Sequence, residues 1–375
     1  MQKGITPAAK FAVAVTTIAA DFAIPSEPFV IAPVESGGRN MRTLASLLVV
    51  VGAIAFPSSR AWSGSEVMIA AVARPQRILW EEPVDIRTRN LYYGPGGREG
   101  QPKAPFTFVE EDHGGTNPKF EVRDAAGKRW KVKLGIEARP ETAATRLLWA
   151  VGFITNDNYL LPEINVKNMP AHLSRGKTLV DSNGSIRAAR LQRPPHGKKI
   201  GHWGWKHNPF VETREFNGLR VMMALLSNWD LKEVNNSIYA DDHDSGPALY
   251  EVSDLGSTFG KSGESYRGAT SKNNLSAYQR SAFVSKVTRD RVSFHFPTHL
   301  PYLYIFNLPL FVSESRAHWI GQDIPRADVR WISSFLTQLS TQQIRDAFRA
   351  AGYSQEQVEG YTAVVQARIA QLEQL

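Results

Sequence analysis

Two stretches, Asn228–Asn236 (NWDLKEVNN) and Val252–Gly256 (VSDLG), decide how this chain of 375 residues is interpreted. In the first stretch, Asn235 comes five residues after Asp230. In the second, Asp254 follows a short β-like run and precedes a hydrophobic residue and a glycine. Carboxylate and amide oxygens are suitable ligands for Mg²⁺. The two stretches therefore predict a site with three oxygen ligands, in which Asn235 and Asp254 hold a metal ion.

The composition indicates a folded chain with anionic partners. Apolar residues make up 42% and aromatic residues 10%, enough for a sizeable core in two domains or one two-lobed domain. Lys and Arg outnumber Asp and Glu by 44 to 36, and the resulting charge of +8 favours nucleotide phosphates, acidic polymers or membrane headgroups. Because the excess is spread along the chain, nucleic-acid binding is not expected. The absence of cysteine excludes disulfides, thiolate catalysis and Cys-ligated zinc.

The N-terminal region has the pattern of a signal peptide. A basic segment, Arg39–Arg42, precedes the apolar run Leu44–Phe56, and small residues follow it. The run is shorter than the roughly 20 residues that a membrane-spanning helix needs. We therefore interpret residues 1–61 as an N-terminal extension with a signal-like segment, which predicts export to the periplasm or the extracellular space. Retention of the segment would tether the chain to a membrane, a cytoplasmic location is the alternative, and Met41 rather than Met1 could be the true start.

The next part of the chain predicts an irregular lead-in and then a β-rich lobe. Residues 62–104 are rich in Pro, Gly and Arg and show little periodicity. From residue 105 to 170, alternating patterns predict antiparallel strands, and one helix opens at Pro140-Glu141 and ends near Gly152. The strands are expected over Phe106–Val109, Phe120–Asp124, Trp130–Leu134, Tyr159–Leu161 and Ile164–Val166.

Residues 171–375 predict a mostly helical lobe. A hairpin turning at Asn183-Gly184 and a basic stretch, Arg193–His207, form an expected insertion near residues 175–210. We interpret the basic stretch as a solvated insertion with its tryptophans packed on the lobe; contact with an anionic substrate or, peripherally, with a membrane is the alternative. A second expected hairpin carries the two aspartate motifs at its ends. Helices are expected over Glu212–Leu226, Val329–Leu339, Gln342–Ala351 and Gln355–Leu375.

Several of these positions suit phosphoryl transfer, which requires held phosphates, a positioned Mg²⁺ and an aimed acceptor hydroxyl. Lys133, at the end of the third strand, could neutralise phosphate charge, with Lys131 on the same face as a rival. Glu141 could pair with that lysine, or it could simply complement the helix dipole. Asp230 would accept or orient the acceptor proton. Asp254 would hold Mg²⁺ bridging two phosphates.

The remaining candidates concern the nucleotide and the second metal ligand. Asn235 would bind Mg²⁺ through its amide oxygen, with the adjacent Asn236 as a rival. Gly114 and Gly115 form the one candidate phosphate loop, and Asn165 is a further candidate nucleotide-binding residue.

The order strand Lys133, helix Glu141, Asp230-x4-Asn235 and Asp254-Leu-Gly resembles the protein-kinase-like fold. The resemblance is to its atypical branch: phosphoinositide lipid kinases, bacterial toxin-type kinases and secretory-pathway kinases. It covers roughly residues 105–260 and implies an α+β fold of two lobes that binds ATP and Mg²⁺ between them. The chain departs from the family in having Asn-Trp before Asp230, no Gly-x-Gly-x-x-Gly loop and no evident activation segment.

The sequence therefore predicts an ATP- and Mg²⁺-dependent phosphotransferase whose acceptor is an unknown protein, lipid or small molecule. Two other functions are consistent with the same residues. One is a catalytically silent kinase-like binding or scaffold protein, which export would favour because ATP is scarce outside the cytoplasm. The other is a nucleotidyl transferase that binds ATP in a flipped pose.

Overall fold

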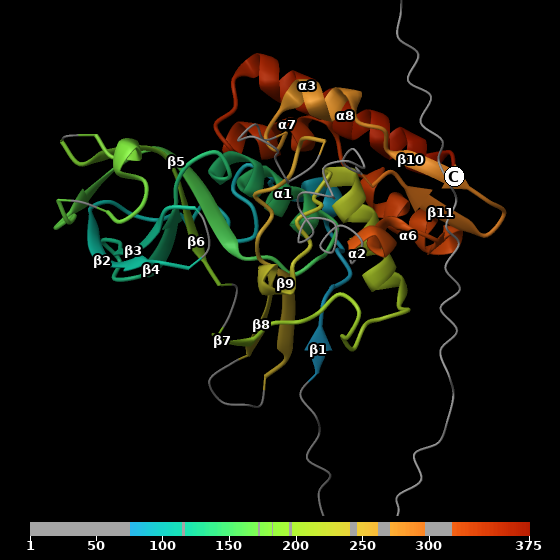
Figure 1. The fold of residues 1–375 in the computed structure, drawn as a ribbon, viewed down its shortest axis with the longest axis horizontal. Coiled ribbons are helices and arrows are strands. Elements are labelled where there is room, and N and C mark those ends of the chain that lie inside the picture. Colours follow the sequence, from blue (N-terminus) through green and yellow to red (C-terminus); the bar gives the residue numbers. More distant parts are fainter. Residues whose placement is uncertain are drawn as a thin grey trace, which may run out of the picture. The chain divides into compact units, whose positions relative to one another are not determined.

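The computed structural model describes residues 76–114, 117–171, 173–181, 183–194, 197–240, 246–261, 271–296 and 317–375. The signal-like segment and Gly115 lie outside the described residues. Within them, no helix is both long enough and apolar enough to span a bilayer. The fold is of the mixed α+β class, with several sheets and a largely helical C-terminal region (Figure 1).

A closed five-stranded barrel forms the first part of the fold. Its strands are β2 (Phe106–Asp112), β3 (Lys119–Arg123), β4 (Arg129–Lys133), β6 (Ser185–Arg193) and β5 (Asp157–Lys167), in that spatial order. Neighbouring strands are antiparallel, as expected, except that β2 and β5 close the barrel as a parallel pair. Closure removes the exposed sheet edges that an open five-stranded sheet would present.

Three details in and beside the barrel differ from the sequence prediction. The two short strands expected around Leu160 and Asn165 form one continuous strand, β5. Strand β6 comes after the expected lobe boundary at residue 170, yet it pairs with both β4 and β5. The first arm of the expected hairpin near residues 175–210 is a 3₁₀ helix, η2 (Lys177–Leu179), with a single bridge from Val180 to Ile186 beyond the Asn-Gly turn.

Alternation along the barrel strands separates an apolar interior from a charged face. Phe120, Val122, Trp130 and Val132 are fully buried and belong to one hydrophobic cluster inside the barrel. Because successive side chains of a strand point to opposite faces, the intervening residues of β3 and β4 point away from that interior. Lys133 is one of these residues, and it points toward helix α1 (Ala138–Ala150).

Helix α1 connects the barrel to the rest of the fold. It contacts β5 and β6 on one side and α7 (Thr341–Ala350) on the other, and Figure 1 shows it between the barrel strands and the C-terminal helices. Ala143, Ala144, Leu147 and Leu148 of α1 belong to a second hydrophobic cluster, which also contains the C-terminal helices. Helix α1, whose first turn carries Glu141, therefore packs into the core of the C-terminal region while also contacting the barrel.

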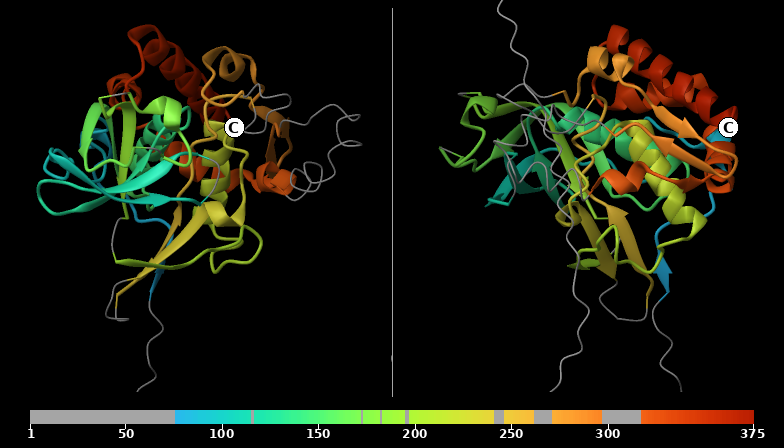
Figure 2. Two further views of the ribbon diagram at one scale, coloured as in Figure 1. Left: turned by 60° about the vertical axis from the view of Figure 1, so that its left-hand side comes forward. Right: turned by 45° about the vertical axis from the view of Figure 1, so that its right-hand side comes forward.

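The second part contains the expected helix and hairpin. Helix α2 (Arg214–Leu226) begins at Thr213, whose side chain accepts a hydrogen bond from the Phe216 amide. Strands β8 (Asn236–Ala240) and β9 (Ala248–Val252) form the hairpin and are visible in both views of Figure 2. Together with β1 (Arg77–Ile78) and β7 (Lys198–Gly201) they make a four-stranded sheet in the order β1-β9-β8-β7.

Trp203 and Trp205 of the basic stretch are buried, so the tryptophans of that stretch pack into the core.

The C-terminal region contains the three expected helices and a small sheet, β10-β11-β12, that the sequence did not predict. The remaining elements are η1 (Ile86–Thr88), η3 (Glu233–Asn235), α3 (Leu275–Arg280), β10 (Val284–Val287), β11 (Arg291–Phe294), η4 (His318–Gly321), β12 (Ile324–Pro325), α6 (Arg326–Leu336), α7 (Thr341–Ala350) and α8 (Gln355–Glu373).

Candidate functional site

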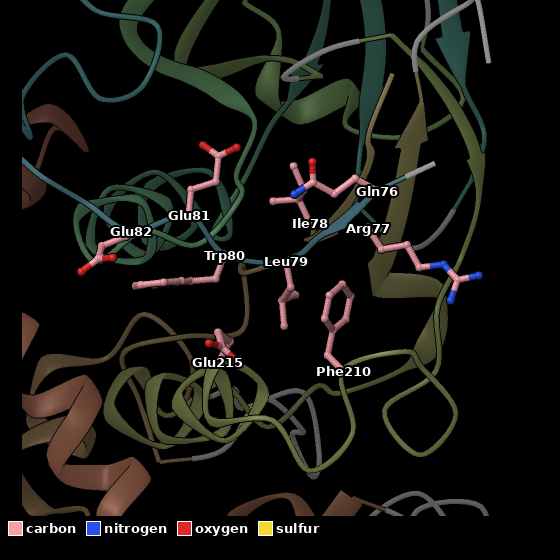
Figure 3. Close-up of a pocket in the computed structure, with 9 residues that line it drawn as sticks. All are labelled: Gln76, Arg77, Ile78, Leu79, Trp80, Glu81, Glu82, Phe210 and Glu215. Carbon is pink, nitrogen blue, oxygen red and sulfur yellow. The ribbon is translucent and has the colours of Figure 1, made fainter. Parts of the chain in front are cut away.

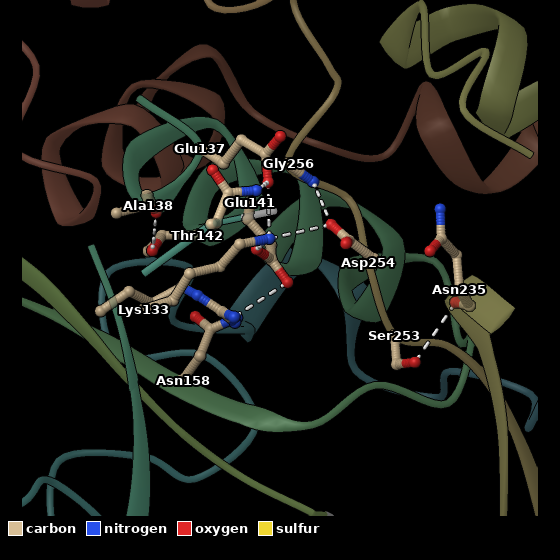
Figure 4. A network of polar contacts seen from close by, with 12 residues as sticks. Lys133, Glu137, Ala138, Glu141, Thr142, Asn158, Asn235, Ser253, Asp254 and Gly256 are labelled. Atoms are coloured by element: carbon tan, nitrogen blue, oxygen red, sulfur yellow. Dashed lines mark hydrogen bonds and ion pairs between the residues drawn. The ribbon is translucent and has the colours of Figure 1, made fainter. Parts of the chain in front are cut away.

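Lys133 lies at the centre of a compact group of carboxylates. Its ammonium is 2.9 Å from an oxygen of Glu141, 3.0 Å from Oδ1 of Asp254 and 2.8 Å from an oxygen of Glu137 (Figure 4). Glu137 directly precedes α1 and Glu141 lies in its first turn, whereas Asp254 follows strand β9, 121 residues after Lys133 in the chain. The fold therefore brings together three residues that the sequence singled out, Lys133, Glu141 and Asp254. Glu137, which the sequence analysis did not single out, is a fourth member of the group.

The local sequence explains how Lys133 reaches these partners. Strand β4 ends at Lys133, and the chain turns through Gly135, whose φ of +87° favours glycine, into α1. Glu137 is four residues after Lys133 and precedes the first residue of the helix, and Glu141 lies in the first turn. Lys133 itself is only 3% exposed, so its charge requires these buried partners.

Arg190 supplies a second cation to this group. It lies on β6 directly opposite Lys133 of β4, and its guanidinium is 3.0 Å from the second carboxylate oxygen of Glu141. Glu141, which is 1% exposed, thus bridges two cations from neighbouring strands. This arrangement fixes the position of the Lys133 ammonium.

Asp254 occupies the exposed side of the group. Its side chain is 38% exposed, and Oδ1 accepts hydrogen bonds from Lys133 and, at 3.2 Å, from the Gly256 amide. Partial burial raises the pKa of Asp254, but the charge of Lys133 and these two hydrogen bonds outweigh burial and hold the pKa below its usual value. Within the described part of the chain Oδ2 has no hydrogen-bond partner, so an ionised oxygen is left for another ligand.

The charge of Lys133 is equally well defined. Burial lowers its pKa, but the carboxylates of Glu141, Asp254 and Glu137 together raise it above the ordinary value. The side chain therefore stays an ammonium across the neutral range.

Gly256 has a packing role. A Cβ atom at this position would lie 2.6 Å from Cβ of Glu137, and its φ is not in the left-handed region. The glycine of the Asp-Leu-Gly motif is therefore required because the chain passes close to the start of α1. This close approach holds Asp254 against Lys133.

The Asp230 motif forms a closed turn after α2. The helix ends at Ser227 in the left-handed conformation, and the buried Trp229 packs on Phe296 with ring centroids 4.9 Å apart. Asp230 forms an ion pair of 2.8 Å with Lys232, and its backbone oxygen accepts a 2.8 Å hydrogen bond from Nδ2 of Asn235. The hydrogen bond from Asn235 back to Asp230 thus closes a turn that contains the 3₁₀ helix η3.

Backbone hydrogen bonds join this turn to the second motif. The carbonyl oxygen of Asn235 accepts the amides of Ser253 at 2.8 Å and of Asp254 at 3.3 Å. The two aspartate motifs, distant in the chain, are therefore neighbours, with Asn235 beside Asp254 as Figure 4 shows.

The structure separates the two pairs of rival residues. Asn236 is fully buried and donates through Nδ2 to the carbonyl oxygen of Trp203, so its side chain lies on the core side of β8. Lys131 is 42% exposed and pairs with Asp112 of β2 at 2.8 Å. Asn235 and Lys133, by contrast, both lie next to Asp254.

Two of the predicted nucleotide-binding residues do not join this group. Gly114 is exposed, and its amide donates to Oδ1 of Asp112 at 2.8 Å. Asn165 is exposed and pairs with Ser185, whereas Leu160 of the same strand pairs with Arg190. Five residues of strand place Asn165 about 17 Å from the level of Lys133.

Sequence reasoning missed Glu137 and its other partners. The Glu137 carboxylate also accepts hydrogen bonds from Asn117, next to the predicted phosphate loop, and from Lys272. Burial raises the pKa of Glu137, but Lys133 and the hydrogen bonds lower it further than burial raises it. The local signal for Glu137 is its position four residues after the strand lysine, but the motif pairs that lysine with Glu141.

A pocket of about 550 Å³ lies elsewhere, beside β1. In Figure 3 Leu79 and Phe210 lie beside each other, whereas Arg77 and Glu82 extend away from each other. Its lining includes Glu81, Glu82 and Glu215 but no member of the Lys133 group. The pocket therefore lacks the converging charges that distinguish the Lys133 site.

Comparisons with known proteins give a weak likeness to a kinase. No protein-family model matches the sequence, and no curated protein matches it. A solved structure, the Helicobacter pylori proinflammatory kinase CtkA, is similar with 14% identity and a TM-score of 0.32, over 71% of this chain and 97% of that chain. A similarity with that TM-score supports no argument about the candidate site, which is therefore interpreted from its own geometry alone.

Proposed function

We propose that this protein is an ATP- and Mg²⁺-dependent phosphotransferase of the atypical kinase-like class, with the barrel as its N-terminal lobe and the helical region as its C-terminal lobe. The observation that carries the proposal is the Lys133 ammonium, held 2.9 Å from Glu141 and 3.0 Å from Asp254. A fixed cation beside an exposed carboxylate is what simultaneous binding of phosphates and their metal ion requires.

The donor atoms fit Mg²⁺. Asp254 has a carboxylate oxygen without a partner among the described residues, and Asn235 uses Nδ2 on the Asp230 carbonyl, which leaves its Oδ1 for a ligand. Oxygen donors of this kind are the ones that Mg²⁺ prefers. When bound, the metal ion would neutralise charge on the transferred phosphoryl group.

The protein residues have separate tasks in this proposal. Lys133 binds phosphate oxygens, and Glu141 with Arg190 keeps Lys133 in position. Asp230 belongs to the same hydrogen-bonded turn as Asn235. In this proposal its carboxylate orients the acceptor hydroxyl and takes its proton. The unidentified acceptor is a protein, lipid or small molecule, and export through the signal-like segment is part of the proposal.

Binding and label transfer with the full-length protein test this function. We expect ATP to bind only with Mg²⁺, and Asp254→Asn to weaken that binding by about tenfold or more, because one charged metal ligand is lost. Asp181→Asn, in an exposed turn, serves as the matched control. Transfer of label from the γ-phosphate supports the kinase, and transfer from the α-phosphate supports the nucleotidyl transferase. Absence of Mg²⁺-dependent ATP binding would leave the silent scaffold.

A further inference from the structure

All the N–H groups of the Lys133 ammonium have carboxylate partners. A lysine ammonium has three donors. Oxygens of Glu137, Glu141 and Asp254 lie 2.8, 2.9 and 3.0 Å from its nitrogen, and the lysine side chain is only 4% exposed. A phosphate oxygen can therefore contact this ammonium only if one of these carboxylates moves away.

Glu141 and Asp254 can both keep their places. The two oxygens of Glu141 face different cations, Lys133 at 2.9 Å and Arg190 at 3.0 Å, and the residue is 1% exposed. Its departure would leave a buried guanidinium without that anion, which is costly. Asp254 contacts Lys133 through Oδ1 alone, so Oδ2 can bind a metal ion while the lysine contact remains.

Glu137 has another cation that can hold it. Its Oε2 faces the lysine ammonium and accepts a hydrogen bond from Asn117, whereas its Oε1 pairs with Lys272. Lys272 is positioned there because Nδ2 of the next residue, Asn273, donates to the Ile136 carbonyl at 3.1 Å. Glu137 can therefore leave the ammonium and keep its ion pair with Lys272.

The Oε2 atom of Glu137 also lies against the Asp-Leu-Gly turn. A Cβ atom at Gly256 would be 2.8 Å from this oxygen, and Figure 4 shows Glu137 beside Gly256. The same oxygen is 2.8 Å from the Lys133 ammonium. A phosphate that contacts both Lys133 and a metal ion on Asp254 needs an anionic oxygen in this region. The Glu137 carboxylate therefore takes the position of such a phosphate oxygen.

We propose that Glu137 is a built-in competitor of the ligand: its carboxylate occupies the phosphate position on Lys133, and phosphates bind by displacing it toward Lys272. This proposal rests on the proposed function, because it concerns the regulation of the same site. It predicts that phosphates bind more tightly to any variant in which the Glu137 carboxylate no longer reaches the ammonium.

Calorimetric titration of the full-length protein with Mg²⁺-ATP tests the proposal. Glu137→Gln removes the competing charge, whereas Glu137→Asp keeps the charge on a side chain that is one methylene shorter. We expect both variants to bind about tenfold more tightly than the unmodified protein, because a charge-assisted contact no longer opposes the ligand. Glu137→Asp separates displacement from simple charge repulsion, since the repulsion would persist in that variant.

Two further variants control for the loss of charge. Asp254→Asn removes a carboxylate 3.0 Å from the same ammonium, yet it should weaken binding, because it also removes the proposed metal ligand. Glu356→Gln, on the exposed surface of α8, should leave the affinity unchanged.

Asn117→Ala tests the same contact without changing any charge. Asn117 is half-buried and donates to the Glu137 oxygen that faces Lys133. We expect the affinity for Mg²⁺-ATP to rise about threefold, because one hydrogen bond no longer holds Glu137 in that position. Thermal denaturation shows which variants fold, and if neither Glu137 variant does, the result for Asn117→Ala decides.

The outcomes separate this inference from the proposed function. If the unmodified protein binds Mg²⁺-ATP and Glu137→Asp binds it no more tightly, the inference is overturned, even if Glu137→Gln gains affinity. The phosphotransferase proposal then still stands if label is transferred from the γ-phosphate. If the variants bind more tightly but transfer no phosphoryl group, the inference holds and the proposed function fails. Binding by neither the unmodified protein nor the variants overturns both.

Discussion

Two fully buried carboxylates, Glu141 and Glu251, lie in opposite electrostatic surroundings. Glu141 on α1 has Lys133 at 2.9 Å and Arg190 at 3.0 Å. Glu251 on β9 accepts one hydrogen bond, of 2.5 Å, from Nδ2 of Asn156, and its other oxygen has no partner among the described residues. One carboxylate is neutralised by cations, whereas the other has only a neutral amide.

The difference shows what holds charge inside this fold. Moving a carboxylate out of water costs several kcal/mol, which nearby cations and hydrogen bonds can offset. Burial raises the pKa of Glu251 to about 7, because the Asn156 hydrogen bond offsets only part of the cost. Burial also raises the pKa of Glu141, even though Arg190 and Lys133 oppose the effect, whereas the shifts of Lys133 and Asp254 favour their charged forms. Glu251, which has no such cation beside it, changes its charge near neutral pH.

Removing the central cation should have the largest effect. Lys133→Met would leave Glu137, Glu141 and Asp254 facing one another without their shared partner, and we expect a loss of about 3–5 kcal/mol in the free energy of unfolding. Urea denaturation measures it. The control is Lys131→Met, because its ion pair with Asp112 is 42% exposed on the lysine side and should contribute little. Equal losses for both variants would contradict the contrast between paired and solvated lysines.

Glu251 should make stability depend on pH. Its folded-state pKa is raised from 4.5 to about 7, so the folded protein binds a proton that the unfolded chain releases. Stability is therefore highest below about pH 4.5 for this group, and falls as pH rises toward 7, by roughly 3 kcal/mol in all.

Glu251→Gln should remove that slope, because glutamine keeps the shape and carries no charge. We expect the variant to be more stable than the unmodified protein at about pH 8 and to lose the advantage near pH 5. Unfolding measured across this range checks the prediction, with Glu356→Gln on the exposed surface of α8 as the control. An unchanged slope would show that Glu251 remains ionised in the fold.

The sequence predicted the parts of the site that depend on local spacing. Lys133 at a strand end, Glu141 in the next helical turn and the Asp-x4-Asn turn follow from short-range patterns. The position of Arg190 opposite Lys133 depends on strand register between β4 and β6, which are separated by α1 and β5. Register and barrel closure are long-range properties, so neither the Arg190 contact nor the remote position of Asn165 could be predicted from spacing.

The adjacent residues Asn235 and Asn236 also differ in whether a charged group lies beside them. Their replacement gives the smallest effect on stability among these predictions. Asn236 is buried among neutral groups, donating to the Trp203 carbonyl at 2.9 Å, whereas Asn235 lies beside Asp254. Asn236→Ala should lower stability by about 1–2 kcal/mol, because the Trp203 carbonyl loses its donor, and should leave Mg²⁺-dependent ATP affinity unchanged. Asn235→Ala should do the reverse, with a smaller change in stability and weaker Mg²⁺-dependent binding. Thermal denaturation and calorimetry on both variants measure the two effects. If Asn236→Ala, and not Asn235→Ala, lowered the ATP affinity, the metal ligand would be the buried asparagine and the site would have to open to bind its ligand.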